Sequence, residues 1–257
     1  MMKRWITFDL DGTLMQNPFG KWVFPEVKQL IEQQLNTTYN STESLVREHE
    51  LRMSQNRSVE AYDWDDMLRQ LLKELQLELE IDIEQLVIKH SVAPKIYLLE
   101  ETIIPTLKSL KQQGYSLATV TNGFYKYQFP VMKALGLSEC FDEIITPEIA
   151  GCGKPNEGIF RALLESGTIV AHVGDRLDHD VFLANHKNVY SILIYHNLPD
   201  CLRPLAPHER PRTESFLQIS EEKLKKESAY LSSTPFPESY TPSHVIYTLA
   251  ELPSILR

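Results

Sequence analysis

The chain has 257 residues, 42% of them hydrophobic, and its 35 acidic against 26 basic residues give a formal net charge of −9. This apolar content excludes a disordered chain. The acidic balance argues against nucleic-acid binding, because phosphate backbones are bound by clustered Lys and Arg. No apolar run is long enough for a signal peptide or a membrane span, so we expect a soluble, cytoplasmic protein.

The first expected strand covers residues 5–8, where β-branched and aromatic residues run into the turn-forming sequence 9–13. Beyond it the chain changes character. From about residue 21 to residue 96, Glu, Gln, Leu and Lys dominate, and apolar residues recur at the three- and four-residue spacing of helices. This pattern predicts an insert of roughly four helices.

Behind this insert, segments with the patterns of strands and of helices alternate. The expected strands are 115–121, 143–145, 168–174, 189–194 and 244–247. The expected helices are 107–113, 125–135, 158–164, a helix that starts at 180–185, and 249–252. This alternation predicts an α/β fold with a parallel sheet. Seven of the 15 prolines lie within residues 197–242, so we expect that segment to be an irregular excursion of the core.

Polar residues that could carry chemistry follow the expected strands. Ligands of parallel sheets bind at the carboxyl ends of the strands, where these side chains would converge: Asp9, Asp11, Thr121, Asn122, Asp175, Asp178 and Asp180, with Lys154 ahead of helix 158–164. Each alone is compatible with a turn, a helix cap or a surface lysine. Together, the carboxylates would repel each other unless a cation holds them, and a lysine and a hydroxyl beside them suit an anion. The combination suits phosphate with Mg²⁺.

Four segments resemble the motifs of one known family, the haloacid dehalogenase superfamily of aspartate-nucleophile phosphotransferases. The sequence FDLDGTL at 8–14 is similar to the first motif of that family, and VTNG at 120–123 is similar to the second. Lys154 resembles the lysine of the third motif, and GDRLDHD at 174–180 resembles the fourth. The resemblance spans about residues 3–195.

This resemblance implies an architecture. Residues 1–20 and 97–257 would form a Rossmann-like parallel-sheet core, and residues 21–96 would form a helical, C1-type cap inserted between the first and second motifs. Such a cap closes over the site, excludes water and carries most of the substrate contacts. The resemblance assigns nothing to residues 197–242.

The same resemblance implies a role for each motif residue. Asp9 would be the nucleophile that accepts the phosphoryl group as an aspartyl phosphate, and Asp11 would be the general acid and then the general base. Thr121, Asn122 and Lys154 would bind the phosphoryl group. Mg²⁺ would be held by Asp9, the backbone carbonyl of Asp11, Asp175 and Asp180.

The predicted function is therefore a Mg²⁺-dependent phosphatase that acts on a small phosphorylated metabolite. Asp11 favours phosphoryl chemistry, because the dehalogenases of the superfamily lack an acid at this position and use no Mg²⁺. Asp178 is the alternative to Asp180 beside the metal, and the spacing of five residues from Asp175 favours Asp180. A phosphomutase and a catalytically silent binding or regulatory protein are the alternative functions. The substrate and the oligomeric state are open.

Other polar residues have a structural interpretation beside a functional one. We expect His179 to be an exposed loop histidine rather than a metal ligand or an acid–base group. Arg47 and Arg52, on an expected cap helix, could bind a second anionic group of a substrate. Trp64 is expected in the core of the cap, with Asp65 and Asp66 facing solvent.

Overall fold

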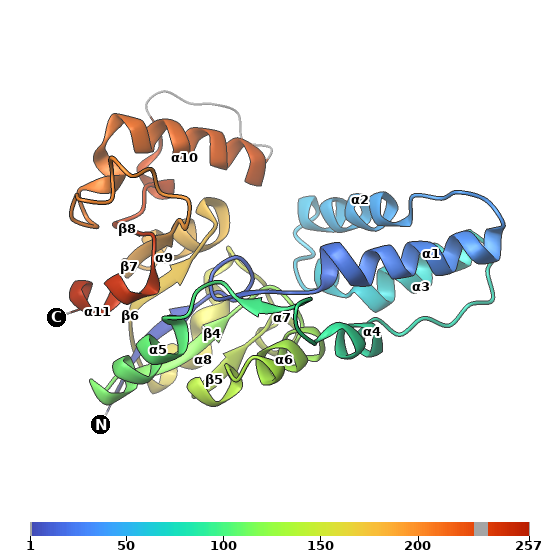
Figure 1. Ribbon diagram of the computed structural model, residues 1–257, viewed down its shortest axis with the longest axis horizontal. Helices are drawn as coiled ribbons and strands as arrows, with labels where there is room; N and C mark the ends of the chain where they lie inside the picture. Colours follow the sequence, from blue (N-terminus) through green and yellow to red (C-terminus); the bar gives the residue numbers. More distant parts are fainter. Residues whose placement is uncertain (1, 229–235, 257) are drawn as a thin grey trace.

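The computed structural model describes residues 2–228 and 236–256 of the chain. Its centre is a six-stranded, all-parallel sheet in the order β5-β4-β1-β6-β7-β8 (Figure 1). The strands are β1 (Lys3–Phe8), β4 (Ser116–Val120), β5 (Glu143–Ile145), β6 (Gly167–Gly174), β7 (Tyr190–Ile194) and β8 (His244–Ile246). Every expected strand of the core is present, with ends close to the expected positions.

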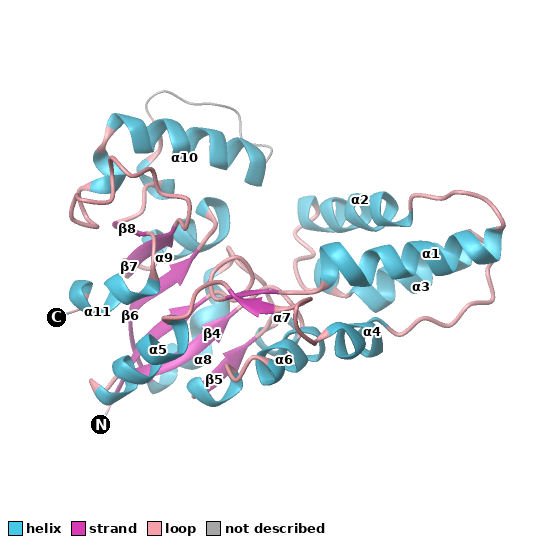
Figure 2. Ribbon diagram, viewed as in Figure 1, coloured by secondary structure: helices cyan, strands magenta, loops and turns pink. Residues whose placement is uncertain are grey.

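Helices cover both faces of this sheet (Figure 2). Side chains alternate along each strand, so Ile6 and Phe8 of β1 pack on one face while Trp5 packs on the other with Phe160 and Leu163. Burial on both faces explains why the strands read as nearly continuous apolar runs. The core helices are α5 (Ile103–Gln112), α6 (Tyr125–Ala134), α7 (Pro147–Ala150), α8 (Arg161–Ser166), α9 (Phe182–His186), α10 (Glu214–Glu227) and α11 (Leu252–Ile255).

Residues 21–96, where the sequence predicts roughly four helices, contain α1 (Phe24–Leu35), α2 (Ser41–Ser54), α3 (Trp64–Glu74) and α4 (Ile83–His90). This segment, for which the resemblance implies a cap, is called the cap below. Three of these helices start at a polar side chain that accepts a backbone N–H of the first turn, namely Asn40, Asp63 and Asp82. The two chain segments that join cap and core pair with each other as β2 (Met15–Gln16) and β3 (Tyr97–Leu98), which are antiparallel.

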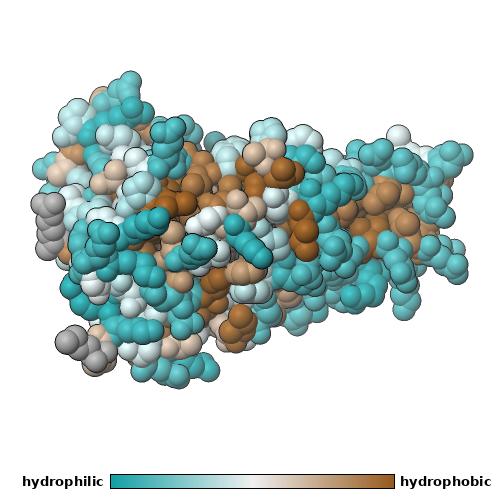
Figure 3. All heavy atoms as spheres, turned by 60° about the horizontal axis from the view of Figure 1, so that its bottom comes forward, coloured by the Kyte–Doolittle hydropathy of each residue, from teal (hydrophilic) through white to brown (hydrophobic). Residues whose placement is uncertain are grey.

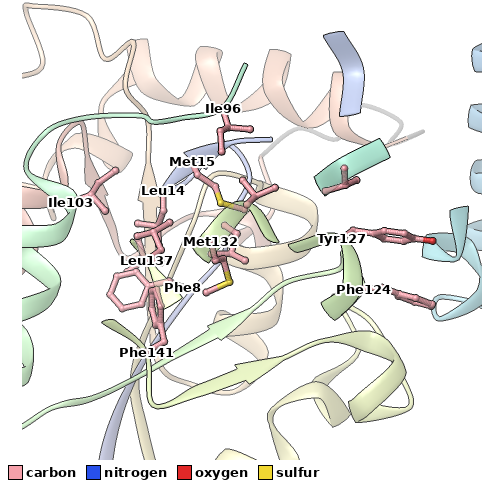
Figure 4. Close-up of a cluster of buried hydrophobic side chains, with 14 of the residues drawn as sticks. Phe8, Leu14, Met15, Ile96, Ile103, Phe124, Tyr127, Met132, Leu137 and Phe141 are labelled. Carbon is pink, nitrogen blue, oxygen red and sulfur yellow. The ribbon is translucent and has the colours of Figure 1, made fainter. Parts of the chain in front are cut away.

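Hydrophobic packing runs without interruption from the sheet to the cap (Figure 4). Phe8 of β1 meets Phe141 edge to face, with ring centroids 5.9 Å apart. Tyr127 of α6 lies on the side of this cluster that faces the cap, and its ring is 5.5 Å from that of Phe19 at the cap entrance. Trp64 packs against Phe24 at 5.0 Å. This contact confirms Trp64 as part of the packing within the cap.

The largest difference from the sequence prediction lies in residues 197–242. This stretch was expected to be irregular, yet it contains α10, a 14-residue helix. Thr213 caps its first turn, and Phe216 and Leu224 are fully buried against the core. The prolines stand outside the helix, so they delimit it rather than prevent it. Residues 229–235 of the stretch lie outside the described residues.

The surface is mixed in character. On the face seen in Figure 3, hydrophobic residues lie in separate groups among hydrophilic ones, over the cap as well as over the core. Within residues 2–228 and 236–256, no helix has both the length and the apolar sequence needed to cross a membrane.

Candidate functional site

The residues singled out in the sequence meet at the carboxyl ends of the central strands. Asp9 follows β1, Thr121 follows β4 and Asp175 follows β6, and these strands are neighbours in the sheet. The residues at these strand ends line a cavity of about 430 Å³. Its lining comprises Asp9, Asp11, Tyr62, Thr121, Asn122, Gly123, Lys154, Asp175, Arg176, His179, Lys223 and Glu227.

Lys154 joins two of the acids. Its ammonium group donates to Oδ1 of Asp9 and to Oδ1 of Asp180, both at 2.6 Å, and the side chain is almost fully buried. A buried ammonium needs such partners, because leaving water without them costs several kcal/mol. The third motif therefore supplies the positive charge that holds the first and fourth motifs together.

A chain of hydrogen bonds behind Asp180 fixes its orientation. Nε2 of His172 lies 3.0 Å from Oδ1 of Asp180, and Nδ1 lies 2.8 Å from the hydroxyl of Thr7. Burial lowers the pKa of His172, and because an ionised Asp180 can only accept, Nε2 of His172 donates to it. The backbone N–H of Arg176 donates to the second oxygen of Asp180 at 3.0 Å. Both oxygens of Asp180 are thus already engaged.

Asp11 is held differently. Nε2 of Gln128, on α6, donates to Oδ2 of Asp11 at 2.7 Å. The other oxygen, Oδ1, is buried and has no hydrogen-bond partner within the described residues. Burial raises the pKa of Asp11 to about 6, against the effect of hydrogen bonds from Gln128 and Asn17. A carboxyl group with one fixed oxygen and one free oxygen can carry a proton at the free position.

Three acids form a group that fits a divalent cation. Ligand oxygens of Asp9, Asp175 and Asp180 lie within 4.8 Å of one another. The hydroxyl of Thr13 lies 3.4 Å from both Asp9 and Asp175. Oxygen-only donors suit a hard cation such as Mg²⁺. Asp180 has both oxygens bound by N–H donors, whereas Asp9 and Asp175 each keep an oxygen that binds no N–H donor within the described residues.

A glycine makes room for this group. Gly12 adopts a φ of +80°, in the left-handed region, and a Cβ on it would lie 2.8 Å from Oδ2 of Asp175. Only a residue without a side chain permits both the turn and the close approach of Asp175. The glycine of the DGT sequence at 11–13 therefore leaves the space that the side chain of Asp175 needs.

Burial and neighbouring charges shift the pKa values of the three acids in different directions. Burial raises the pKa of Asp9 to about 7, against the charge of Lys154, and raises that of Asp175 to about 6. For Asp180, Lys154 and His172 outweigh burial and hold the pKa well below its usual range. Burial alone would lower the pKa of Lys154, but Asp180 and Asp9 raise it. Asp180 and Lys154 thus form the firm ion pair, and an added cation would stabilise the charge of Asp9.

Asn122 links the second and third motifs to the cap. Its Oδ1 accepts the backbone N–H of Lys154 at 2.6 Å, and its Nδ2 donates to the hydroxyl of Tyr62 at 3.2 Å. Ser58, also from the cap, accepts the N–H of Gly153 at 3.0 Å. These hydrogen bonds hold the cap against the site. Asn122 takes part in both contacts, because it binds Tyr62 of the cap and the backbone of Lys154.

The structure corrects three expectations for single residues. His179 is not exposed: its side chain is 13% accessible and lines the cavity, where burial lowers its pKa to about 4. Arg52 is 1% exposed and is bound by Glu48 and Asp66, so it is not free for a substrate anion. Asp65 does not face solvent, because it pairs with Lys126 and accepts from the hydroxyl of Tyr127.

Several lining or supporting residues were missed by sequence reasoning. Gln128, His172, Lys223 and Glu227 lie in segments that resemble ordinary helices or a buried strand. One sequence feature could have indicated the role of His172: a histidine inside a largely apolar strand needs a buried hydrogen-bond partner. Of the two acids considered for the metal site, Asp180 lies in the acid group, while Asp178 pairs with Arg176 at 2.8 Å.

Comparison with known proteins gives a consistent result. The family model of the haloacid dehalogenase-like hydrolases matches residues 3–185. The glyceraldehyde 3-phosphate phosphatase of Methanopyrus kandleri is 29% identical over 198 residues, which cover 74% of this chain and 82% of that protein. The enzyme of the same name from Methanocaldococcus jannaschii is 27% identical over 75% of this chain and 85% of its own length.

Among solved structures, a HAD phosphatase from Thermococcus onnurineus superimposes with a TM-score of 0.66. The two chains are 25% identical, and the alignment covers 99% of this chain and 98% of the other. The similarity therefore extends over the cap and the C-terminal segment as well as over the residues that the family model matches.

Proposed function

This chain belongs to the haloacid dehalogenase-like hydrolase family, in its phosphatase branch, and from this premise we propose that it hydrolyses a small phosphomonoester through a phosphoryl group carried on Asp9, with Mg²⁺ as the cofactor. The main support is the meeting of Asp9, Asp175 and Lys154 in one polar cavity. The carboxylates of Asp9 and Asp175 and the ammonium of Lys154 surround the space that a phosphoryl group would occupy.

Asp9 is the nucleophile in this proposal. One of its oxygens attacks phosphorus, an acyl phosphate forms, and the bond to the leaving oxygen breaks. A carboxylate and a phosphate dianion repel each other, so the negative charge needs compensation. Mg²⁺, held by Asp9, Asp175 and the backbone carbonyl of Asp11, would supply it. Lys154 donates to the same carboxylate and orients it.

Asp11 carries the proton. Its free Oδ1 gives a proton to the leaving oxygen and later takes one from the water that attacks the acyl phosphate. The raised pKa of Asp11, about 6, leaves part of the group protonated near neutral pH. Gln128 keeps the other oxygen in place. Asp9 and Asp11 thus take opposite roles although they are two residues apart.

Thr121 and Asn122 complete the phosphoryl site. Thr121 is buried at the end of β4, and its hydroxyl accepts the N–H of Gly123 at 3.3 Å, so the hydroxyl proton is free to bind a phosphoryl oxygen. Asn122 positions Lys154 through the backbone. We assign Asp180 to the support of Lys154 rather than to direct coordination, because both its oxygens are engaged.

The substrate that fits best is a small hydroxylated phosphomonoester such as a sugar phosphate. The cavity of about 430 Å³ suits a small molecule. Most of its described lining residues carry charged or polar side chains, which suits a leaving group with hydroxyl or carbonyl oxygens. Relatives named glyceraldehyde 3-phosphate phosphatase agree with a three-carbon or somewhat larger sugar phosphate.

Release of inorganic phosphate from a substrate panel tests this function. The panel holds glyceraldehyde 3-phosphate, glycerol phosphate, hexose phosphates and p-nitrophenyl phosphate, each assayed with Mg²⁺ and with a chelator. We expect turnover with Mg²⁺ and a loss of at least about 100-fold on chelation. Conversion of a sugar phosphate to an isomer without phosphate release would identify a mutase instead. Absence of turnover over the whole panel would contradict the proposal.

The titration of Asp9 and Asp175 predicts a pH-dependent effect of Mg²⁺ on stability. Their folded-state pKa values, about 7 and about 6, lie above the ordinary value of 3.8. The metal-free protein therefore loses stability as pH rises from about 4 to about 7, where both acids become charged in the folded state. We expect Mg²⁺ to raise Tm more at pH 7.5 than at pH 5, measured by thermal denaturation. An equal shift at both pH values would contradict it.

A further inference from the structure

The last turn of α10 reaches the cavity from the side opposite the cap. Figure 1 shows α10 above the core, with its C-terminal end directed toward the cap. Two of its side chains, Lys223 and Glu227, line the cavity together with Asp9, Asp175 and Tyr62. The wall of the site is therefore shared between the cap and a helix that lies between β7 and β8 in the sequence.

The position of this turn is fixed by the core. Phe216 and Leu224 of α10 are buried in one cluster with Leu177, which lies two residues after Asp175. The backbone N–H of Leu177 donates to Oε2 of Glu227 at 2.8 Å, and Arg176 donates to the carbonyl of Glu227 at 2.9 Å. The end of the helix is thus built onto the loop that carries Asp175.

Lys223 and Glu227 can form more hydrogen bonds than they make within the described residues. They form an ion pair, with Nζ and Oε1 2.8 Å apart and side chains 20% and 8% exposed. Each oxygen of Glu227 has one partner, Lys223 for the buried Oε1 and the N–H of Leu177 for Oε2, and each can accept a second hydrogen bond. The ammonium of Lys223 has three N–H donors, and the ion pair engages at most one of them. The remaining donors of Lys223 and the remaining acceptor capacity of Glu227 therefore belong to two side chains that line the same cavity.

We propose that Lys223 and Glu227 select the leaving group of the substrate: Glu227 accepts a hydrogen bond from a hydroxyl, and Lys223 donates to a neighbouring hydroxyl or carbonyl oxygen. This inference rests on the proposed phosphatase function and adds a recognition element outside the cap. A donor and an acceptor side by side match a polyhydroxylated chain, whereas a p-nitrophenyl group has no hydrogen-bond donor and only the weak acceptors of its nitro group. Specificity for the hydroxylated class is thus carried by α10.

The test compares Lys223→Met with Lys226→Met in the full-length protein. Lys226 lies three residues further on the same helix and is exposed. Both substitutions remove one charge from α10, but only the first removes a cavity donor. Values of kcat/KM are measured for glyceraldehyde 3-phosphate and for p-nitrophenyl phosphate, with the Mg²⁺ concentration for half-maximal rate and Tm as further readouts.

We expect Lys223→Met to lower kcat/KM for the sugar phosphate about 10- to 100-fold, mainly through KM, and to lower it clearly less for p-nitrophenyl phosphate. Glu227→Gln should change the ratio in the same direction, and Lys226→Met should leave it within about twofold. Equal losses on both substrates, with a raised Mg²⁺ requirement, would assign Lys223 to the support of Asp175 and overturn the inference. An unchanged ratio would overturn it too.

The wild-type rates separate the two proposals. If the wild type hydrolyses the panel but Lys223→Met discriminates as the wild type does, the phosphatase function stands and only the role of α10 fails. If the wild type hydrolyses neither substrate with Mg²⁺, the proposed function fails and the role of α10 fails with it. Tm of each variant shows whether a lost rate reflects unfolding.

Discussion

Replacing Asp9 with Asn is expected to lower kcat by at least about 10³-fold, because the amide cannot attack phosphorus or carry the acyl phosphate. The substitution keeps the size of the side chain and removes a charge whose burial is unfavourable. We therefore expect no loss of thermal stability without Mg²⁺. The rise of Tm on addition of Mg²⁺ should become smaller, because one ligand has lost its charge.

Asp200→Asn is the matched control for this variant. It makes the same chemical change at a side chain that is 91% exposed, so activity and Mg²⁺ response should equal those of the wild type. Steady-state phosphate release with Mg²⁺ measures the first effect, and thermal denaturation measures the second. Wild-type turnover that survives Asp9→Asn would remove Asp9 as the nucleophile.

Lys154→Met should have the largest effect on stability. The substitution leaves Asp9 and Asp180 buried without their shared counter-charge, and breaking a buried pair in this way costs about 3–5 kcal/mol. The free energy of unfolding in denaturant measures it. The loss should shrink toward pH 4, because Asp180 without the lysine takes up a proton more easily. Activity should fall as well, since the phosphoryl group loses a cationic partner.

Lys111→Met serves as the control for the stability measurement. Lys111 pairs with Asp142 at 2.7 Å, but the two side chains are 35% and 32% exposed. Loss of such a surface pair costs about 0–1 kcal/mol. If both lysine variants lost the same small amount, the buried position of Lys154 would not govern stability, and the electrostatic account of the site would be wrong.

The sheet and the motif residues could be predicted because local signals and tertiary structure agree there. Buried parallel strands such as 168–174 are mostly apolar, and the turn after β1 needs a glycine at position 12. The carboxyl ends of neighbouring strands then meet whatever the loops do. Placement of Asp9, Thr121 and Asp175 around one cavity therefore follows from strand order alone.

The remaining features depend on contacts that sequence patterns do not encode. Helix α10 has few apolar residues and prolines on either side, so its burial through Phe216 and Leu224 is a property of the fold. His179 reads as an exposed loop residue, but its ring lies at the cavity wall beside Asn122 and Asp178. Arg52 reads as a free surface cation, yet tertiary packing gives it two carboxylate partners.

Trapping of the acyl phosphate tests the central claim most directly. Enzyme turning over a phosphomonoester with Mg²⁺ is treated with sodium borohydride, which reduces a phosphorylated aspartate to homoserine, and the peptides are analysed by mass spectrometry. We predict homoserine at position 9 in the wild type during turnover and none without substrate. Full turnover with Asp9 unmodified, or with the label on another carboxylate, would contradict the account.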